Sequence, residues 1–314
     1  MATIVNDANF VRAESNRMFA GIQAQAGGVN RWGHFRGLTP LDEQSVIRMN
    51  RDTLYSFAIV DISAGATMTI PDSGERYLSV MVVNQDHYIN RIFHEPGSYP
   101  ISTAEFDTPY VLLAARILVD ASDPEDVKQV NELQDGFSLT AQSNEPFVLP
   151  DYDEASFTAT RGALLDQARR GMSGTTGMFG TKDAVDHDKH LLGTAAGWGG
   201  LPENEAFYVS VEPHLPVGAY RITAKDVPVD AFWSITLYNA DGFMQQNARD
   251  AYSVNSVSGV KNDDGSITVH LGGEDDRPNC LPIMDGWNYL IRLYQPRPEV
   301  LDGTWTFPAH EPAS

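Results

Sequence analysis

The stretches RYLSVMVVNQDHY (residues 76–88) and AFWSITLYNADGF (residues 231–243) align without gaps, and this internal repeat decides the fold class. Serine, asparagine and aspartate coincide in the two copies, as do the aromatic residues near their ends. In each copy a run rich in β-branched and aromatic residues leads into an Asn-x-Asp turn, which is typical of a strand that ends in a tight turn. The repeat therefore predicts two related β units.

A second pair of matching segments follows the two copies in the same order. RILV at 116–119, followed by PE at 124–125, parallels RLY at 292–294, followed by PE at 298–299. The spacing between the first and second matches differs, which indicates insertions between them. Because two pairs of matching segments occur in the same order, a duplicated β unit is a better explanation than chance similarity.

Strand patterns dominate the rest of the chain, with a few helices between them. An apolar stripe predicts a helix over residues 6–26, which Asn6 or Asp7 can cap and which Gly27-Gly28 ends. The nearly unbroken apolar run at 110–119 indicates a strand that is covered on both faces. Further helices are expected over 123–133, 153–170 and 186–192, further strands over 54–62, 67–70, 206–211, 218–222, 267–271 and 289–294, and a hairpin turn at 262–265 between strands 257–260 and 267–270.

These patterns predict a mainly β protein of two domains. A chain of 314 residues is long for one core and comfortable for two. The predicted organisation is an N-terminal helix (1–28), a first β-sandwich domain (29–170), a helical and Gly-rich linker (171–200) and a second β-sandwich domain (201–314).

The charge of the chain limits its partners. Its 42 acidic and 22 basic residues give a formal net charge of −20. Such an acidic protein repels phosphate backbones and anionic lipids, so neither nucleic acid nor a membrane is an expected partner. No run of 18 or more apolar residues is present, and residues 1–7 lack the basic and apolar pattern of a signal peptide. Cys280 is the only cysteine, which excludes an intrachain disulfide, and a cytoplasmic location is expected.

One pair of neighbouring segments concentrates ionisable and aromatic side chains. WGHFR (32–36) is followed by MNRDTLYS (49–56) at the start of a predicted strand. Asp52 is the candidate general acid or base, His34 its partner, and Tyr55 the candidate proton donor. This interpretation predicts that Asp52→Asn keeps the fold and abolishes turnover.

Further residues of the same segments are candidates for substrate binding. Arg36 or Arg51 can hold an anion, and Asn50 can orient the substrate or Asp52. A structural interpretation is also open, in which Asn50 and Asp52 cap the start of the strand and Arg51 pairs with a surface carboxylate. The asparagine and aspartate residues of the repeat, at 84, 86, 239 and 241, are expected to hold turns, and the helical pair His187 and His190 is expected on an exposed polar face.

These residues also resemble a known family. HFR (34–36), NRDTLYS (50–56) and VDIS (60–63) resemble the bacterial domain of unknown function 1254. GWGGLP (197–202), AFWSITLY (231–238), DGS (264–266) and LDGTW (301–305) resemble the domain of unknown function 1214, its usual downstream partner. The resemblance implies two tandem jelly-roll-like antiparallel β-sandwich domains with a few peripheral helices, and a homo-oligomer.

Two functions of different class remain open. The first is a small-molecule enzyme of hydrolase or lyase type that uses acid and base residues in a polar pocket of the first β domain, with no cofactor and no metal site. The second is a non-catalytic, oligomeric assembly protein that binds a carbohydrate or a protein partner. In that case the tryptophans, above all Trp198 and Trp233, would line the binding surface, although tryptophans at this spacing also suit a core. The acidic segments at 262–265 and 274–276 leave calcium binding open.

Overall fold

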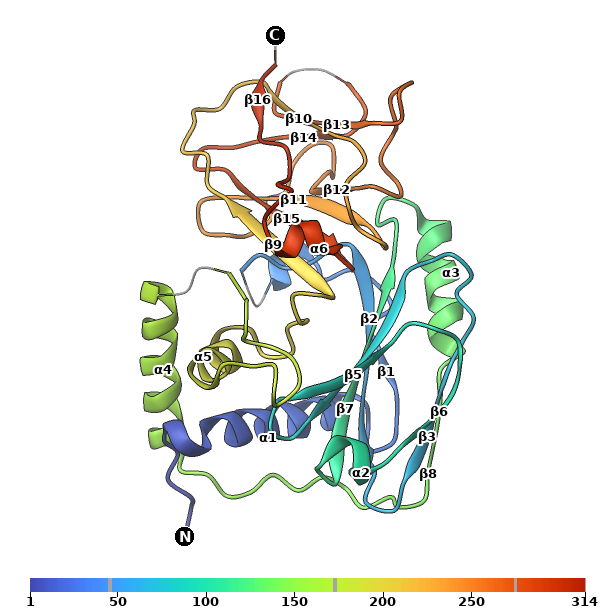
Figure 1. The fold of residues 1–314 in the computed structure, drawn as a ribbon, viewed down its shortest axis with the longest axis vertical. Helices are drawn as coiled ribbons and strands as arrows, with labels where there is room; N and C mark the ends of the chain where they lie inside the picture. The colour runs from blue at the N-terminus through green and yellow to red at the C-terminus, as the bar shows by residue number, and fades with distance from the viewer. Residues whose placement is uncertain (45–46, 172–173, 274–275, 314) are drawn as a thin grey trace. The chain divides into compact units, whose positions relative to one another are not determined.

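A computed structural model of the chain describes residues 1–44, 47–171, 174–273 and 276–313 (Figure 1). The chain forms two compact units. Unit 1 comprises residues 1–36, 54–119 and 124–202, and unit 2 comprises residues 37–53, 120–123 and 203–314. The fold is mainly β with antiparallel sheets and a few helices, which confirms the predicted fold class. The helix at 1–28 and the segment 171–200, expected as separate parts, are both counted within unit 1.

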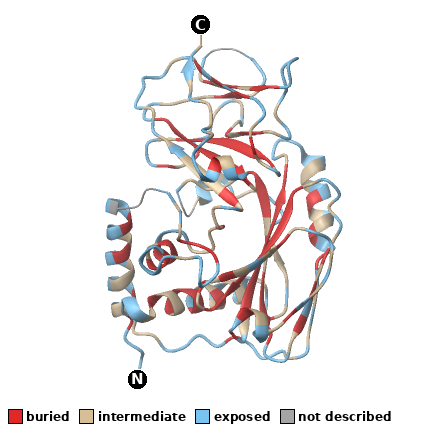
Figure 2. Cartoon of the chain, in the orientation of Figure 1, coloured by how far each residue is buried: buried red, intermediate tan, exposed pale blue. Residues whose placement is uncertain are grey.

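Unit 1 contains two antiparallel sheets. The larger has the strand order β1-β2-β7-β4-β5, and the smaller has the order β6-β3-β8. Figure 2 shows the central strands β4 and β7 buried along almost their whole length, as the apolar run at 110–119 predicts. The strands are β1 (Gly33–His34), β2 (Thr53–Asp61), β3 (Ala66–Ile70), β4 (Leu78–Asn84), β5 (Ile89–Phe93), β6 (Gly97–Ile101), β7 (Tyr110–Leu118) and β8 (Ser138–Ala141).

Helices cover the larger sheet of unit 1. Three of them, α1 (Asp7–Gln25), α4 (Glu154–Gly171) and α5 (His187–Gly197), pack together around Phe10, Phe157 and Leu191. As predicted, Asn6 caps α1 by accepting a hydrogen bond from the backbone N–H of Ala8. The helix α3 (Pro124–Asp135) lies on the other side of the sheet (Figure 1), and α2 (Thr103–Phe106) precedes β7.

Unit 2 contains two four-stranded sheets. One has the order β12-β11-β15-β9, and the other has the order β14-β13-β10-β16, in which only β13 and β14 pair in parallel. Alternate residues of β11, including Trp233 and Ile235, enter a hydrophobic core shared with β10 and β13. The elements are β9 (Ala206–Val211), β10 (Tyr220–Ala224), β11 (Trp233–Tyr238), β12 (Ser253–Asn255), β13 (Ile267–Leu271), β14 (Cys280–Leu281), β15 (Asn288–Tyr294), α6 (Pro298–Leu301) and β16 (Glu311–Pro312).

The internal repeat is visible in the strand register. In unit 1 the repeat strand β4 pairs with β7, and Ser79 lies opposite Arg116. In unit 2 the repeat strand β11 pairs with β15, and Ser234 lies opposite Arg292. The two matched segments of the sequence are therefore neighbouring strands in each unit, with the same serine–arginine pair at the same place.

The turns after the repeat strands are also equivalent. The side-chain oxygen of Asn84 accepts hydrogen bonds from the backbone N–H groups of Asp86 and Tyr88. The side-chain oxygen of Asn239 accepts from the N–H groups of Asp241 and Phe243 in the same way. The expectation that these asparagines hold turns is confirmed.

The structure corrects one strand and adds others. The turn at 262–265 is present, because the N–H of Gly265 donates to the carbonyl of Asn262, but residues 257–260 form no strand. The strand that precedes the turn is instead β12, which pairs with β11. The sequence analysis also missed β5, β6 and β8, which are short and largely half-exposed, so that they lack a long apolar run.

Candidate functional site

The predicted site residues divide between the two units. Asp52 and its neighbours belong to unit 2, although strand β2 belongs to unit 1 from residue 54 onwards. His34, Arg36, Tyr55 and Trp198 lie in unit 1, and Asn50, Arg51, Asp52 and Trp233 lie in unit 2. The pairing of His34 with Asp52 stays a prediction.

Asp52 is buried in a polar cluster on the face of β11 that points away from the hydrophobic core. Its exposed fraction is 1%. One carboxylate oxygen accepts a hydrogen bond from the Ser234 hydroxyl at 2.5 Å and one from the Tyr294 hydroxyl at 3.4 Å. The other accepts from the Ser253 hydroxyl at 3.1 Å. These bonds hold the carboxylate between β11, β12 and β15.

Arg292 is the cation of the same cluster. It is 2% exposed and donates hydrogen bonds to the Thr236 and Tyr238 hydroxyls, at 2.8 and 2.9 Å, and to the carbonyl of Arg48 at 2.8 Å. Burial by itself would lower the pKa of Arg292, but Tyr238 and the negative charge of Asp52 outweigh it and raise this pKa. Arg292 is therefore a fixed cation whose charge Asp52 helps to balance.

Asn50 and Arg51 hold the segment that carries Asp52. The Asn50 side chain accepts from the N–H of Asp52 at 2.8 Å and donates to the Tyr294 hydroxyl at 3.0 Å. The Arg51 guanidinium lies 4.8 Å from the ring centre of Tyr252, and burial lowers the pKa of Arg51. These contacts match the structural interpretation in which Asn50 caps the start of the strand.

His34 and Arg36 lie beside α3 in unit 1. Nδ1 of His34 is 2.8 Å from the hydroxyl of Ser56, its partner across β1 and β2. Burial and the nearby charge of Arg36 lower the pKa of His34. Arg36 pairs with Asp135 and donates to the carbonyl of Asn131, so its charge is already balanced.

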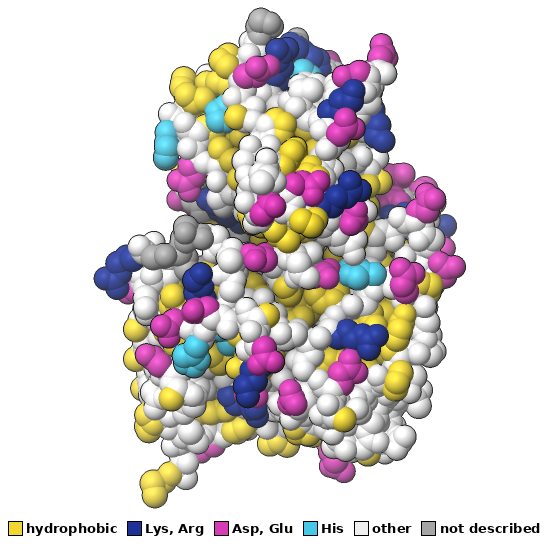
Figure 3. All heavy atoms as spheres, in the orientation of Figure 1, with side chains coloured by type: hydrophobic (Ala, Val, Ile, Leu, Met, Phe, Trp, Pro, Cys, Tyr) yellow, Lys and Arg dark blue, Asp and Glu magenta, His cyan; other side chains and the backbone are white. Residues whose placement is uncertain are grey.

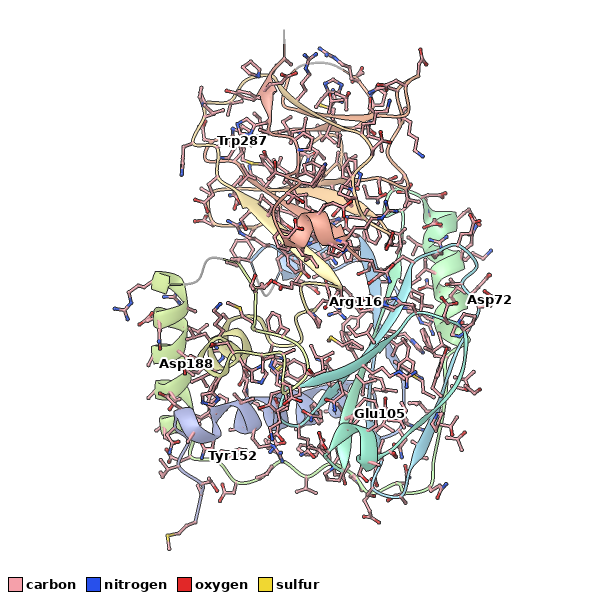
Figure 4. The ribbon with its side chains drawn as sticks, viewed as in Figure 1. Asp72, Glu105, Arg116, Tyr152, Asp188 and Trp287 are labelled. Carbon is pink, nitrogen blue, oxygen red and sulfur yellow. The ribbon has the colours of Figure 1, made fainter. Side chains whose placement is uncertain are left out.

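Tyr55 points to the opposite face of the sheet from Ser56, because successive side chains of a strand alternate. There the guanidinium of Arg116 lies 5.5 Å from the Tyr55 ring centre. Arg116 is 8% exposed, and its Nη2 donates to the carbonyl of Gly199 at 2.9 Å. Its Nη1 is buried without a partner, and no carboxylate among the described residues forms an ion pair with it. Figure 4 labels Arg116 in unit 1.

Ser79 completes this second polar centre. It is fully buried opposite Arg116, and its oxygen accepts a hydrogen bond from the Tyr77 hydroxyl at 3.1 Å. In unit 2 the equivalent Ser234 donates its own proton to Asp52. Sequence reasoning did not single out Ser79 or Arg116 as functional, although the repeat aligns them with Ser234 and Arg292.

Of the two tryptophans predicted to bind a ligand, Trp198 is half-buried and Trp233 is buried, and both make contacts within their own unit. Trp198 donates its indole N–H to the Ser15 hydroxyl at 3.1 Å and stacks on His87, with ring centres 5.3 Å apart. Trp233 is 4% exposed and packs edge-on against Phe307. Both positions suit a core role, the alternative that the spacing left open.

A stack of two buried histidines lies next to Trp198. The expectation that His190 lies on an exposed helix face is wrong, because His190 is 3% exposed and its ring stacks on that of His87. Nε2 of His87 accepts from the N–H of Gly199 at 2.9 Å, and its Nδ1 lies 2.8 Å from the Thr194 hydroxyl. Burial, together with nearby His190, lowers the pKa of His87 well below its ordinary value.

Acid is therefore expected to destabilise the protein through His87. The unfolded chain takes up a proton near pH 6.5, whereas folded His87 stays neutral. The contribution to stability is complete above that pH, and up to about 1.4 kcal/mol is lost for each pH unit below it. Urea unfolding at about pH 7.5 and about pH 5.5 measures this slope. His87→Asn, which suits the φ of 61° at this residue, should flatten it. Equal slopes for the two proteins would contradict the assignment.

Comparison with known families fits this arrangement. A family model described as a protein of unknown function (DUF1254) matches residues 29–141, and one described as a protein of unknown function (DUF1214) matches residues 214–298. The chain carries these two domains in tandem. Tyr55, Ser79 and Arg116 fall within the DUF1254 match, and Ser234 and Arg292 fall within the DUF1214 match.

Solved structures share the DUF1254–DUF1214 fold. The VPA0106 protein from Vibrio parahaemolyticus superposes with a TM-score of 0.72 at 18% sequence identity, covering 98% of each chain. An uncharacterized protein from Burkholderia cenocepacia superposes with a TM-score of 0.52 at 16% identity, covering 97% of this chain and 87% of the other. No curated protein matches the chain significantly. These identities show the fold alone.

Two further features of the DUF1254–DUF1214 chain concern metals and membranes. Within the described residues, no three His, Cys, Asp or Glu side chains are grouped so that they could hold a metal ion. No helix of the described part of the chain is both long and apolar enough to cross a membrane.

Acidic side chains are scattered over the face shown in Figure 3 rather than gathered in one patch.

Proposed function

We propose that the protein is a small-molecule enzyme of hydrolase or lyase type whose substrate carries a carboxylate, and that Arg116 binds this carboxylate in unit 1. One observation carries the proposal. Arg116 is a buried cation with an unpartnered Nη1 and no ion pair among the described residues. Its equivalent in unit 2, Arg292, donates to the Thr236 and Tyr238 hydroxyls, and the negative charge of nearby Asp52 helps to raise its pKa.

The cost of burying a charge supports an anionic ligand at this position. A buried guanidinium without a counter-ion is unfavourable by several kcal/mol, so a protein keeps one where something else supplies the negative charge. Arginine is always protonated, so Arg116 cannot lower this cost by losing its proton. A bound anion would remove the cost, and the same energy would then contribute to the affinity for the ligand.

Unit 2 indicates which anion fits. There a carboxylate accepts the hydroxyl proton of Ser234, directly opposite Arg292. In unit 1 Ser79 occupies the equivalent position, and its oxygen already accepts from Tyr77, so its proton can be donated to a ligand. A carboxylate also matches the planar, two-pronged donor pattern of a guanidinium. The ligand group would thus take the place that Asp52 takes in the other unit.

Tyr55 is the proposed proton donor. Its ring lies beside the Arg116 guanidinium, so its phenol group would be close to a substrate held by Arg116. In hydrolysis water adds across an ester or amide bond, the leaving group takes the proton of Tyr55, and the attacking water returns one to Tyr55. Asp52, which the sequence suggested as the general acid or base, is engaged with Ser234 and Ser253 within unit 2.

Ligand-induced stabilisation tests the binding step. The probes are short mono- and dicarboxylates, the matching uncharged amides, phosphate and sulfate, and the measurement is the unfolding temperature. At least one carboxylate should stabilise the wild type, and its amide should not. Arg116→Met should weaken that binding by about thirtyfold, because a charged hydrogen-bonded contact contributes roughly 2 kcal/mol. Stabilisation by phosphate and sulfate but by no carboxylate would contradict the carboxylate assignment.

A matched variant and a turnover assay complete the test. Arg91→Met removes an arginine of the same unit that is exposed and paired with Glu105, and it should leave carboxylate binding unchanged. Esters and amides that contain the best carboxylate are then assayed for turnover. Tyr55→Phe should keep the binding and lower turnover by at least about a hundredfold. Equal carboxylate binding by the wild type and Arg116→Met would refute the binding role of Arg116. Full turnover by Tyr55→Phe would refute the role of Tyr55 as proton donor.

A further inference from the structure

A polar cavity lies in unit 2, distant in sequence from Arg116. It is a cleft of about 390 Å³, a volume that suits a small ligand. Its polar lining is Arg48, Glu212, His214, Asp241, Trp287 and Asn288. We propose that this cleft binds a neutral polyhydroxylated ligand, a sugar or a sugar-like polyol. The proposal goes beyond the function proposed for unit 1 and does not depend on it.

Two glycines let the turns around the cleft approach each other. Gly286 has a φ of 72°, and a Cβ there would lie 2.7 Å from the Cβ of Ala240. Gly242 has a φ of 85°, and a Cβ there would lie 3.1 Å from Ile47. Both residues have a left-handed backbone and little space for a side chain, so glycine suits both positions and lets the two turns lie close together.

Three buried polar atoms of the lining residues have no hydrogen-bond partner. They are Nη1 of Arg48, Nε1 of Trp287 and Oδ1 of Asn288. Trp287 is 2% exposed and Asn288 is 5% exposed, so bulk water does not readily satisfy them. The remaining groups are engaged, since Nη2 of Arg48 donates to Glu212 at 3.0 Å and Nδ2 of Asn288 donates to the carbonyl of Asn239 at 2.6 Å. Unpaired buried polar groups are unfavourable, and a ligand that pairs with them would gain that energy.

The pattern of these atoms selects the ligand chemistry. Arg48 and Trp287 each offer a donor, whereas Asn288 offers an acceptor. A hydroxyl group both accepts and donates, so a polyol can satisfy donors and acceptors together. Glu212 and Asp241 add acceptors and place two carboxylates beside Arg48, which disfavours an anionic ligand.

The packing of Trp287 excludes a cage for an organic cation. Its ring is packed against Tyr220, Tyr289 and His310, with ring centres 5.4, 6.1 and 6.0 Å away (Figure 4 labels Trp287). A cation site would need the open face of an aromatic ring. Here the N–H edge of the indole is the group left for recognition, as in a hydrogen bond to a sugar hydroxyl.

Calorimetric titration of the full chain with a panel of sugars tests the proposal. The probes are glucose, galactose, mannose, a disaccharide, glucuronate and glucosamine. At least one neutral sugar should bind saturably and more tightly than glucuronate or glucosamine. Trp287→Phe, which keeps the ring and removes the N–H, should weaken that binding about fivefold, as expected for one hydrogen bond. Arg48→Met, as a second variant, should weaken it at least as much.

Trp305→Phe is the matched control. Trp305 is in the same unit, packs against the hydrophobic core and does not line the cleft, so its replacement should leave sugar binding unchanged. If Trp287→Phe does not fold, the affinity of the Arg48→Met variant for the sugar tests the proposal. Absence of saturable binding by every neutral sugar, tighter binding of glucuronate, or unchanged affinity in the variants that fold would overturn the proposal.

Discussion

Replacing Asp52 by asparagine is expected to lower the free energy of unfolding by about 3 kcal/mol, because it removes a buried negative charge that stabilises the charge of Arg292. The carboxylate accepts hydrogen bonds from Ser234 and Ser253, and its charge helps to balance that of Arg292. An amide has the same size but no charge, and it leaves Arg292 as a buried cation without its counter-charge. Urea unfolding followed by tryptophan fluorescence measures the loss.

Two further variants serve as comparisons for Asp52→Asn. Ser253→Ala removes one hydrogen bond to Asp52 and should cost about 1 kcal/mol. Asp263→Asn, at an exposed turn position of the same unit, should leave the unfolding midpoint unchanged. If Asp52→Asn were as stable as the wild type and only turnover were lost, the catalytic role suggested by the sequence would be favoured, and Asp52 would not act as the structural counter-ion of Arg292.

Substitution of the two equivalent arginines is expected to have different effects on stability. Arg292→Met should lower the free energy of unfolding by about 3 kcal/mol, because Asp52 loses its cation and Thr236 and Tyr238 lose a hydrogen-bond partner. Arg116→Met should leave stability unchanged or raise it by up to about 2 kcal/mol, because it removes a buried charge that no described carboxylate balances. A methionine fills most of the volume of the arginine stem in both cases.

The comparison uses one chain and one type of substitution, so effects on the unfolded state are similar in the two variants. It is made in buffer that contains no carboxylate, since a bound anion would stabilise the wild type and hide the difference. Equal destabilisation by the two substitutions would mean that Arg116 has a structural role like that of Arg292. The proposed anion site would then lose its physical basis.

Local patterns in the sequence were sufficient to predict much of the fold. The helix at 6–26 and the strand at 110–119 have long, regular apolar patterns, and both are present at nearly the predicted bounds. The short strands β5 and β6 have mixed burial, and their pairing partners rather than their own composition decide their structure. The internal repeat was the most informative feature, because it matched strands that proved equivalent in register.

The site was less predictable from the sequence, because it depends on which buried charged residues lack an oppositely charged partner in the folded protein. The density of ionisable groups at 49–56 correctly marked a polar cluster, but Asp52 satisfies its hydrogen bonds within unit 2. Arg116 stands in an apolar run and looks like an isolated charge in the sequence. Its lack of a carboxylate partner within the described structure follows from tertiary contacts alone. The alignment with Arg292 was the one available indication.

The most direct test of the Arg116 site is nuclear magnetic resonance of protein that contains isotope-labelled arginine, with the Arg116 and Arg292 side-chain signals assigned by substitution. A stabilising carboxylate is expected to shift the guanidinium signal of Arg116 in a saturable way and to leave that of Arg292 unchanged. If the Arg116 signal stays in place while the same carboxylate stabilises the protein, the anion binds elsewhere and the proposed site is wrong.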